Sequence, residues 1–141
     1  MQWNDTYLRV RYQETDQMGV VYHGNYYTWF EVGRSDFFRS LGYSYVLLEK
    51  EGIIMPIISS YCEYKIPAKY DQEILIRTRI NSIKGARLEF NYQILHKEDN
   101  ALLATGKTIH AFADKNMKPV NFKKTNPALW IILNKCTAEV F

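Results

Sequence analysis

One carboxylate and the predicted start of a helix lie close together in the chain, and together they have the groups that cleavage of an acyl bond requires. Asp16 stands in a polar turn, QETDQMG, and a helix is predicted to begin near Asn25. A carboxylate can attack a carbonyl carbon or activate a water molecule that does so. The first N–H groups of a helix lack intrahelical partners and attract negative charge, which suits a developing oxyanion. The alternative role for Asp16 is structural, because an aspartate in a polar turn often accepts a backbone hydrogen bond.

The composition is that of an ordinary globular chain, and it excludes several classes of function. With 141 residues the chain is expected to form a single domain, residues 1–141. The net charge is only +3 and the basic residues are dispersed, which argues against a nucleic-acid partner. No apolar run is long enough to span a membrane, and the first residues do not resemble a signal peptide, so a cytoplasmic protein is expected. Cys62 and Cys136 lack partners at metal-ligand or disulfide spacing, so we expect buried thiols and no metal site.

The N-terminal half is predicted to contain a strand and then the only long helix. Alternation over residues 7–12 predicts a strand that buries Leu8, Val10 and Tyr12. The helix that follows has Asn25 as its N-cap and Gly42 as its stop. Its apolar stripe consists of Tyr26, Trp29, Phe30, Gly33, Phe37 and Leu41. A glycine on that stripe, Gly33, indicates that the helix approaches a sheet closely.

The remaining chain is predicted to form strands and a short terminal helix. Residues 53–66 predict a long, mostly buried strand or a pair of strands broken at Pro56. Alternating runs at 74–80, 88–94 and 102–113 are joined by connectors too short for crossover helices, so the sheet is predicted to be antiparallel. Asn126 and Pro127 open the terminal helix. The whole is an α+β domain whose long helix covers the sheet, and edge pairing is expected to give a homodimer or homotetramer.

The segment RYQETDQMGVVYHGNYYTWFEVGR, residues 11–34, carries a family resemblance. Its Y-x-x-T-D, G-V-V-Y-H and N-Y elements resemble the signature of hotdog-fold thioesterases related to 4-hydroxybenzoyl-CoA thioesterase and to the Tol-Pal-associated acyl-CoA thioesterases. The later segment SSYCEYKIPAKYDQEI resembles the second strand of that family and the turn after it. The resemblance implies a hotdog fold, with about five antiparallel strands wrapped around one long helix, and an acyl-CoA thioesterase activity.

The resemblance also implies roles for individual residues. Asp16 is the catalytic nucleophile or general base, and the backbone amide of His23, seven residues later, polarises the thioester carbonyl. Tyr12 and the His23 side chain orient the carboxylate or the substrate, although Tyr12 could equally be ordinary strand packing. Asn25 begins the helix and fixes the substrate-binding turn, and Gly19 lets the backbone pass beneath the substrate.

Coenzyme A is part of the expected substrate, and its phosphates require basic side chains. The resemblance makes Lys84 and Arg87 the first candidates and Lys65 and Lys69 the second, with solvated surface charge as the alternative for each. A related branch of hotdog enzymes takes its carboxylate from within the helix, but here we expect Glu31 to be a structural or interface residue. His96 and His110 are expected to have core or surface roles.

The leading hypothesis is hydrolysis of an acyl-CoA thioester without a metal or redox cofactor. An acyl carrier protein thioesterase is the alternative enzyme, and it would need an exposed basic surface for an acidic partner. A non-catalytic acyl-CoA-binding hotdog protein is the alternative of a different class. A hydratase or dehydratase is disfavoured, because the sequence offers no second acid/base pair.

Overall fold

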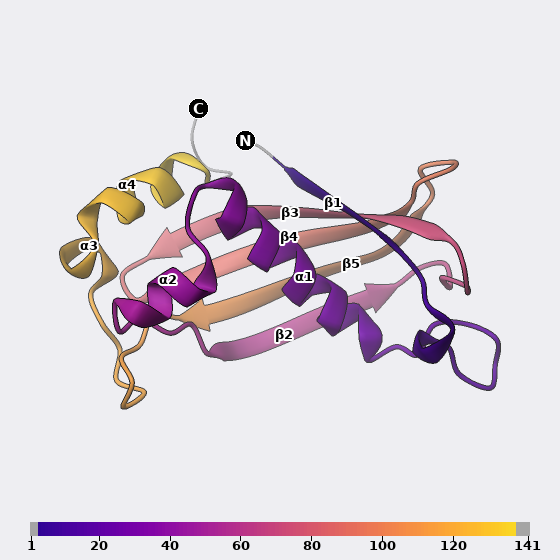
Figure 1. Ribbon diagram of the computed structural model, residues 1–141, viewed down its shortest axis with the longest axis horizontal. Coiled ribbons are helices and arrows are strands. Elements are labelled where there is room, and N and C mark those ends of the chain that lie inside the picture. The colour runs from indigo at the N-terminus through magenta and orange to yellow at the C-terminus, as the bar shows by residue number, and fades with distance from the viewer. Residues whose placement is uncertain (1–2, 138–141) are drawn as a thin grey trace.

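A computed structural model describes residues 3–137, which form one antiparallel sheet with helices on one face and at one end (Figure 1). The strands are β1 (Asn4–Arg9), β2 (Ile57–Tyr64), β3 (Glu73–Lys84), β4 (Arg87–His96) and β5 (Leu102–Ala111). The helices are α1 (Asn25–Ser40), α2 (Tyr45–Lys50), α3 (Phe122–Thr125) and α4 (Pro127–Lys135), and a 3-10 turn, η1, covers Tyr12–Glu14. No helix within residues 3–137 has the length and apolar character required to cross a membrane.

Each strand runs antiparallel to its neighbours, and the order across the sheet is β1-β3-β4-β5-β2. Gly85 and Ala86 join β3 to β4, and residues 97–101 join β4 to β5. Gly85 has a φ of 58°, in the left-handed region that glycine adopts without strain. These short connections agree with the antiparallel sheet that the sequence predicts.

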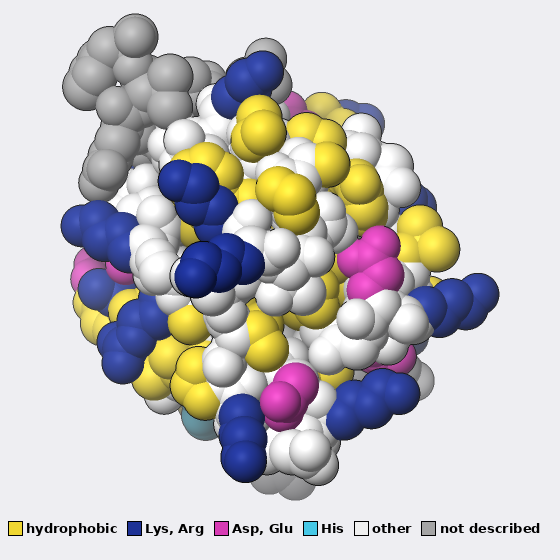
Figure 2. Space-filling model, turned by 90° about the vertical axis from the view of Figure 1, so that its left-hand side faces the viewer, with side chains coloured by type: hydrophobic (Ala, Val, Ile, Leu, Met, Phe, Trp, Pro, Cys, Tyr) yellow, Lys and Arg dark blue, Asp and Glu magenta, His cyan; other side chains and the backbone are white. Residues whose placement is uncertain are grey.

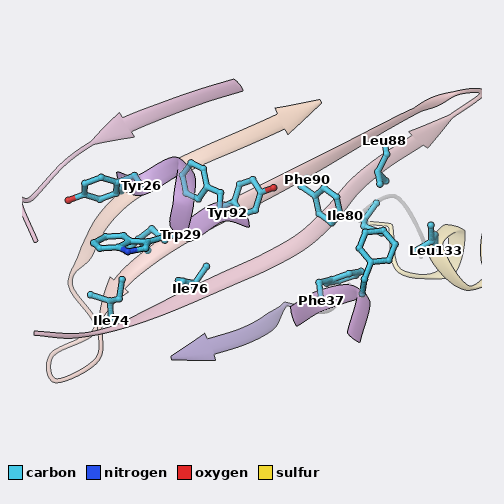
Figure 3. Close-up of a cluster of buried hydrophobic side chains, with 14 of the residues drawn as sticks. Tyr26, Trp29, Phe37, Ile74, Ile76, Ile80, Leu88, Phe90, Tyr92 and Leu133 are labelled. Atoms are coloured by element: carbon cyan, nitrogen blue, oxygen red, sulfur yellow. The ribbon is translucent and has the colours of Figure 1, made fainter. Parts of the chain in front are cut away.

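Helix α1 lies across the sheet and closes the core between them. The strand residues predicted to share a face are buried together, each 0% or 1% exposed: Ile74, Ile76, Ile80, Leu88, Phe90, Tyr92 and Ile94. Figure 3 shows several of them beside Tyr26, Trp29 and Phe37 of α1. A Cβ atom on Gly33 would overlap the Thr78 hydroxyl and lie 2.8 Å from Ile76 Cγ2, so the close approach predicted at this glycine is confirmed.

The predicted stop of α1 is also confirmed. Gly42 has a φ of 84°, which turns the chain out of the helix. Its N–H donates to the carbonyl of Arg39, and the N–H of Tyr43 donates to the carbonyl of Phe38. These two bonds are those of a Schellman motif, and they satisfy carbonyl groups that the end of the helix would otherwise leave unpaired.

Helices α2, α3 and α4 gather at one end of the sheet, opposite the segment of residues 10–24 (Figure 1). Figure 2 views the molecule from that end. The Asn126 side chain caps α4 by accepting from the N–H of Leu129, and Pro127 lies in its first turn, as predicted. Asn126 also donates to the Glu51 carboxylate at 2.8 Å, which ties α4 to the end of α2. The sequence predicts α4 but not α2 or α3.

The first strand differs from its prediction in position. β1 covers Asn4–Arg9, earlier than residues 7–12, because Tyr12 already belongs to η1. Leu8 and Val10 pack on the core as the alternation predicts. Tyr12 does not, since its side chain is 76% exposed.

Strand β2 is the larger departure, because the sequence predicts it to be mostly buried. It forms an edge of the sheet, and α1 packs mainly on β1, β3 and β4, touching β2 near its end, where the Tyr26 ring lies 5.0 Å from the Tyr64 ring. Ile57, Ile58, Tyr61 and Tyr64 are each between 43% and 50% exposed. Cys62 on this strand, like Cys136, is free and only partly buried, which corrects the expectation of fully buried thiols. Exposed apolar side chains on an edge strand are a common means of association between chains.

A chain of hydrogen bonds crosses the core from α1 to the segment before β2. Arg34 Nη1 lies 3.3 Å from the Tyr92 hydroxyl, which lies 2.6 Å from the Thr108 hydroxyl. Thr108 Oγ1 is 2.8 Å from Nε2 of His110, whose Nδ1 is 3.1 Å from the carbonyl oxygen of Met55. All of these side chains are buried, so each polar group needs a partner inside the protein.

The groups at the two ends of this series of hydrogen bonds determine which atom donates in each bond. The carbonyl of Met55 can only accept, so Nδ1 of His110 carries the proton and Nε2 accepts from Thr108. Thr108 in turn accepts from Tyr92, which accepts from Arg34. Burial lowers the pKa of His110 to about 4, so the ring is neutral at physiological pH, as the chain requires.

The lowered pKa of His110 predicts a loss of stability in acid. Unfolded His110 titrates near its ordinary pKa of 6.5, whereas folded His110 titrates at about 4. Between those values the unfolded state binds a proton that the folded state does not, so the free energy of unfolding falls as the pH falls. Titration of this residue should lower the free energy of unfolding by roughly 2 kcal/mol between about pH 7 and about pH 5.

The measurement is urea unfolding at both pH values for the wild type and for His110→Gln. Glutamine can accept from Thr108 and donate to Met55 but does not titrate. The variant should therefore lose less stability than the wild type between the two pH values. An equal loss in both proteins would contradict the assignment.

Candidate active site

The predicted catalytic aspartate lies in a small hairpin between β1 and α1. Thr15 and Val21 form an antiparallel bridge at its base. Asp16 begins the turn, with its N–H donating to Val20 and its carbonyl accepting from Gly19. Gly19 has a φ of 77° and open space where a Cβ would stand. The glycine is thus required by backbone conformation, while its predicted place beneath a substrate stays a prediction.

Glu14 fixes this hairpin to α1. Its carboxylate is buried, with Oε1 accepting from the N–H of Arg11 and Oε2 from the indole N–H of Trp29, both at 2.8 Å. Its carbonyl oxygen accepts from the Asn25 side chain and from the N–H of Tyr22. Four donors therefore converge on one residue, and they position the loop against the first two turns of α1.

The start of α1 leaves backbone donors available. The N-cap is Gly24 instead of the predicted Asn25, whose side chain is used by Glu14. The helix opens with the N–H groups of Asn25, Tyr26 and Tyr27, which donate to the carbonyls of residues 22, 23 and 24. Among the described residues, no acceptor is found for the N–H groups of His23 and Gly24. Two adjacent donors at a helix N-terminus can bind an oxyanion.

Asp16 and His23 line the same cavity, which has a volume of about 250 Å³. The residues after β2 form its far wall, and Val21 and Tyr26 hold that wall in place through hydrogen bonds to the backbone of Ala68. The full lining is Asp16, Met18, Val20, Val21, His23, Tyr26, Tyr64, Lys65, Ile66 and Pro67. The cavity therefore offers one carboxylate, one imidazole, one ammonium group and an otherwise apolar and aromatic surface.

The side chains of the site are held by few but specific contacts. Asp16 Oδ1 accepts from the N–H of Met18 at 2.8 Å, so the aspartate has the structural role that its turn suggested and lines the cavity as well. The His23 ring packs 4.4 Å from the Tyr22 ring, and no hydrogen bond joins it to Asp16 among the residues described. The Tyr64 hydroxyl donates to the carbonyl of His23 at 3.0 Å, which fixes the peptide that joins His23 to Gly24.

Of the other candidates from the sequence, Lys65 lines this cavity, and the rest lie elsewhere. Tyr12 packs its ring against Tyr70, with centroids 5.5 Å apart, and is not part of the lining. Lys84 and Arg87 stand where β3 ends and β4 begins, at the opposite end of the sheet (Figure 1). Lys65 lines the cavity and Lys69 does not, so one second choice is better placed than either first choice.

A larger hollow of about 530 Å³ lies near the start of β3 and the end of β4. Two of its lining carboxylates are engaged in ion pairs, since Arg9 contacts Asp71 and Glu73 and Lys97 contacts Glu73. No helix start faces it, because its lining comes from strand ends and from residues 70–72. The smaller cavity with Asp16 is therefore the better candidate for a reaction centre.

Reasoning from the sequence missed Glu14, Tyr26 and Tyr64. Glu14 is a charged residue in a polar turn, and nothing in its neighbours marks it as buried. Tyr26 was placed on the apolar stripe, but its hydroxyl bond to the N–H of Ala68 joins segments far apart in the chain. Tyr64 is one of several tyrosines on a strand, and its contact with His23 depends on how β2 ends beside α1.

Comparison with known proteins gives a consistent result. Residues 10–128 match the family model of the thioesterase-like superfamily. The putative acyl-CoA thioesterase YneP of Bacillus subtilis is 36% identical over 85% of this chain and 87% of its own length. The acyl-CoA thioesterase YbgC of Haemophilus influenzae is 32% identical over 83% of this chain and 86% of its own length. The crystal structure of DHNA-CoA thioesterase from Staphylococcus aureus superposes with a TM-score of 0.88 at 36% identity, covering 94% of this chain and 89% of that one.

The position of Glu14 predicts a large effect from a small substitution. Glutamine at this position has one acceptor oxygen for two buried donors, Arg11 N–H and Trp29 Nε1, so Glu14→Gln leaves one donor facing an amide N–H. We expect a loss of about 1–3 kcal/mol in the free energy of unfolding. The measurement is chemical denaturation of Glu14→Gln, Trp29→Phe and the double variant. The double variant should lose less than the sum of the single losses, whereas strict additivity would show that the two side chains are not coupled.

Proposed function

Because this chain belongs to the thioesterase-like superfamily and is a thioester hydrolase of the hotdog fold, we propose that it cleaves acyl-CoA thioesters in the cavity that contains Asp16. The observation that carries the proposal is the meeting of a carboxylate with a helix start whose N–H groups at His23 and Gly24 have no acceptor among the described residues. A thioester needs those two features, a nucleophile or base on one side and donors for its carbonyl oxygen on the other.

In the proposed reaction the thioester carbonyl oxygen accepts hydrogen bonds from the N–H groups of His23 and Gly24. The dipole of α1 adds to this stabilisation as negative charge develops on that oxygen. The Tyr64 bond to the His23 carbonyl keeps the peptide between His23 and Gly24 in the orientation that presents the Gly24 N–H. The acyl carbon then lies between these donors and the Asp16 carboxylate.

Asp16 acts in one of two ways, and both give the same products. As nucleophile its free oxygen adds to the acyl carbon, the C–S bond breaks, CoA leaves as a thiolate, and water then hydrolyses the mixed anhydride. As general base it takes a proton from water while the water oxygen adds to the acyl carbon, after which the C–S bond breaks, and the proton passes to the CoA thiolate. The balanced reaction is RCO–S–CoA plus water giving RCOOH and HS–CoA. Neither route uses a metal or redox cofactor, and coenzyme A takes part only as the substrate.

The cavity lining supports an acyl group that is apolar or aromatic. Tyr26, Tyr64 and the His23 ring offer flat surfaces, and Met18 and Ile66 add apolar ones. The similar Staphylococcus aureus protein is a thioesterase for DHNA-CoA, so aromatic acyl-CoAs are the first class to test. Lys65 lies at this cavity and forms an ion pair with Glu63, and we propose that it contacts a CoA phosphate in exchange for that carboxylate.

The central prediction concerns Asp16→Asn. Asparagine can still accept the Met18 N–H through its side-chain oxygen, so the turn keeps its conformation while the nucleophile or base is lost. We expect kcat to fall by a factor of about 10²–10⁴. The measurement is release of free thiol from a panel of short, long and aromatic acyl-CoAs.

The controls make the result decisive. Circular dichroism and the unfolding midpoint of Asp16→Asn should match those of the wild type. A folded variant with near wild-type turnover would contradict the role of Asp16. If the wild type cleaves acyl carrier protein thioesters and no acyl-CoA, the carrier protein substrate replaces the present proposal, and if it cleaves neither, a non-catalytic binding role does.

We further propose that the enzyme is a homodimer formed at the exposed edge of β2. The outer edge of this strand has no neighbour in the sheet order, and apolar side chains stand on it and just beyond it, including Ile57, Ile58, Tyr61 and Ile66. Antiparallel pairing of two β2 strands about a two-fold axis would satisfy the edge and cover these side chains. Because Tyr64 and Ile66 line the cavity, the partner subunit would lie beside the active site.

Ile58→Lys tests this interface. A lysine on an edge strand opposes pairing, so the variant should elute as a monomer in size-exclusion chromatography with light scattering. Ile131→Lys is the matched control, because Ile131 is 48% exposed and Ile58 is 47% exposed, but Ile131 lies on α4. The proposal fails if the wild type is monomeric or if both variants dissociate alike.

A further inference from the structure

The end of the molecule that carries α3 and α4 concentrates positive charge. Residues 115–135 contain five lysines and no aspartate or glutamate. Each of them is exposed: Lys115, Lys118, Lys123, Lys124 and Lys135. We call these lysines, together with Met117, Trp130 and Ile131, the basic end face. Figure 2 shows basic side chains around exposed apolar ones at this end of the molecule, with acidic side chains among them.

The fold brings these residues onto one surface. Phe112 at the end of β5 stacks on Phe122 of α3, with ring centroids 4.1 Å apart. The turn between them is closed by Asp114, whose carboxylate accepts from the N–H groups of Asn116 and Lys118. The base of the turn that carries Met117 therefore lies beside α3, and α3 packs against α4.

Within residues 3–137, none of the five lysines of the basic end face forms an ion pair with a carboxylate. Asp114 directly precedes Lys115, but backbone N–H groups occupy its Oδ1. Lys123 stands 4.7 Å from the centre of the Trp130 ring, a cation–π contact that leaves its charge in place.

Apolar side chains project from the same surface. Helix α4 buries Leu129 and Leu133, and between them Ile131 is 48% exposed on the opposite side. Met117 is 61% exposed at the tip of the turn, where its φ is 64°. Lysines around protruding apolar groups match the boundary of a bilayer, with cations at the phosphates and apolar groups among the acyl chains.

We propose that the basic end face docks on an anionic phospholipid surface. Solvated lysines alone would explain the charge but not the exposed Met117 and Ile131 among them. An acidic carrier protein is the other partner with complementary charge, but this face lies at the end of the sheet opposite the Asp16 cavity (Figure 1). The 16 residues of α1 alone separate the two ends by about 24 Å, which a tethered substrate would have to cross. Docking on a membrane does not require a tethered substrate to cross this distance. The inference does not rest on the proposed function.

The test is co-sedimentation of the full chain with vesicles. The wild type should bind vesicles of phosphatidylglycerol and phosphatidylcholine and should not bind phosphatidylcholine alone. Each lysine near an anionic surface contributes a factor of about five to binding, so Lys123→Gln/Lys124→Gln should reduce the partition coefficient by about 30-fold. Ile131→Gln should also weaken binding, without reducing its dependence on salt.

The matched control is Lys97→Gln/Lys107→Gln, which removes the same charge from strand β5 and from the turn after β4. It should bind vesicles as the wild type does, and neither double variant should change hydrolysis of a short acyl-CoA in free solution. If the two double variants lose vesicle binding equally, binding depends on the net charge of the protein and not on the basic end face, and the proposal is overturned. Absence of wild-type binding to anionic vesicles would also overturn it, and lysine-dependent binding of acyl carrier protein in its place would assign the face to a protein partner.

Discussion

The geometry of the active site depends on one buried carboxylate, that of Glu14. A buried charge is unfavourable unless hydrogen bonds surround it, and here the Arg11 N–H and the Trp29 indole supply them. The hairpin that contains Asp16 can therefore pack on α1 only in the arrangement that satisfies Glu14. The backbone carbonyl of Glu14 accepts from the Asn25 side chain, and the N-cap of the helix is Gly24, so no side chain caps the helix start. Glu14 thus holds the hairpin so that Asp16 lines the same cavity as His23, at the start of α1.

The features that could be predicted from the sequence are those governed by local rules. Alternation in the central strands, the turn at Gly42 and the cap at Asn126 each depend on a few neighbouring residues, and the structure agrees with all three. The close approach at Gly33 follows from one glycine on an apolar stripe. Asp16 and His23 were recognised through a dense motif, and the structure brings both to one cavity. Their catalytic roles remain part of the proposed function.

The features that could not be predicted depend on contacts between distant segments. An apolar strand has the same sequence pattern whether it lies in the middle of a sheet or at an edge, so the exposure of β2 was not apparent. Asn25 resembled an N-cap because its real partner, the Glu14 carbonyl, lies on another element. Lys84 and Arg87 resembled phosphate ligands by their place at strand ends, but the sequence does not say which end of the sheet faces the cavity.

The close packing of α1 on the sheet also bears on the selection of a substrate. Gly33 lets the helix touch β3, and Gly106 lets the Phe30 ring lie directly on β5 beside Tyr92. In the proposed function, this close packing leaves little space for an acyl group beneath the helix. The cavity instead borders Tyr64 and Ile66, so a longer acyl group would lie toward the edge of β2. In the proposed dimer the residues that limit acyl length would then lie at the edge of the sheet beside the partner subunit, where substitutions can change selectivity without disturbing the hydrophobic core.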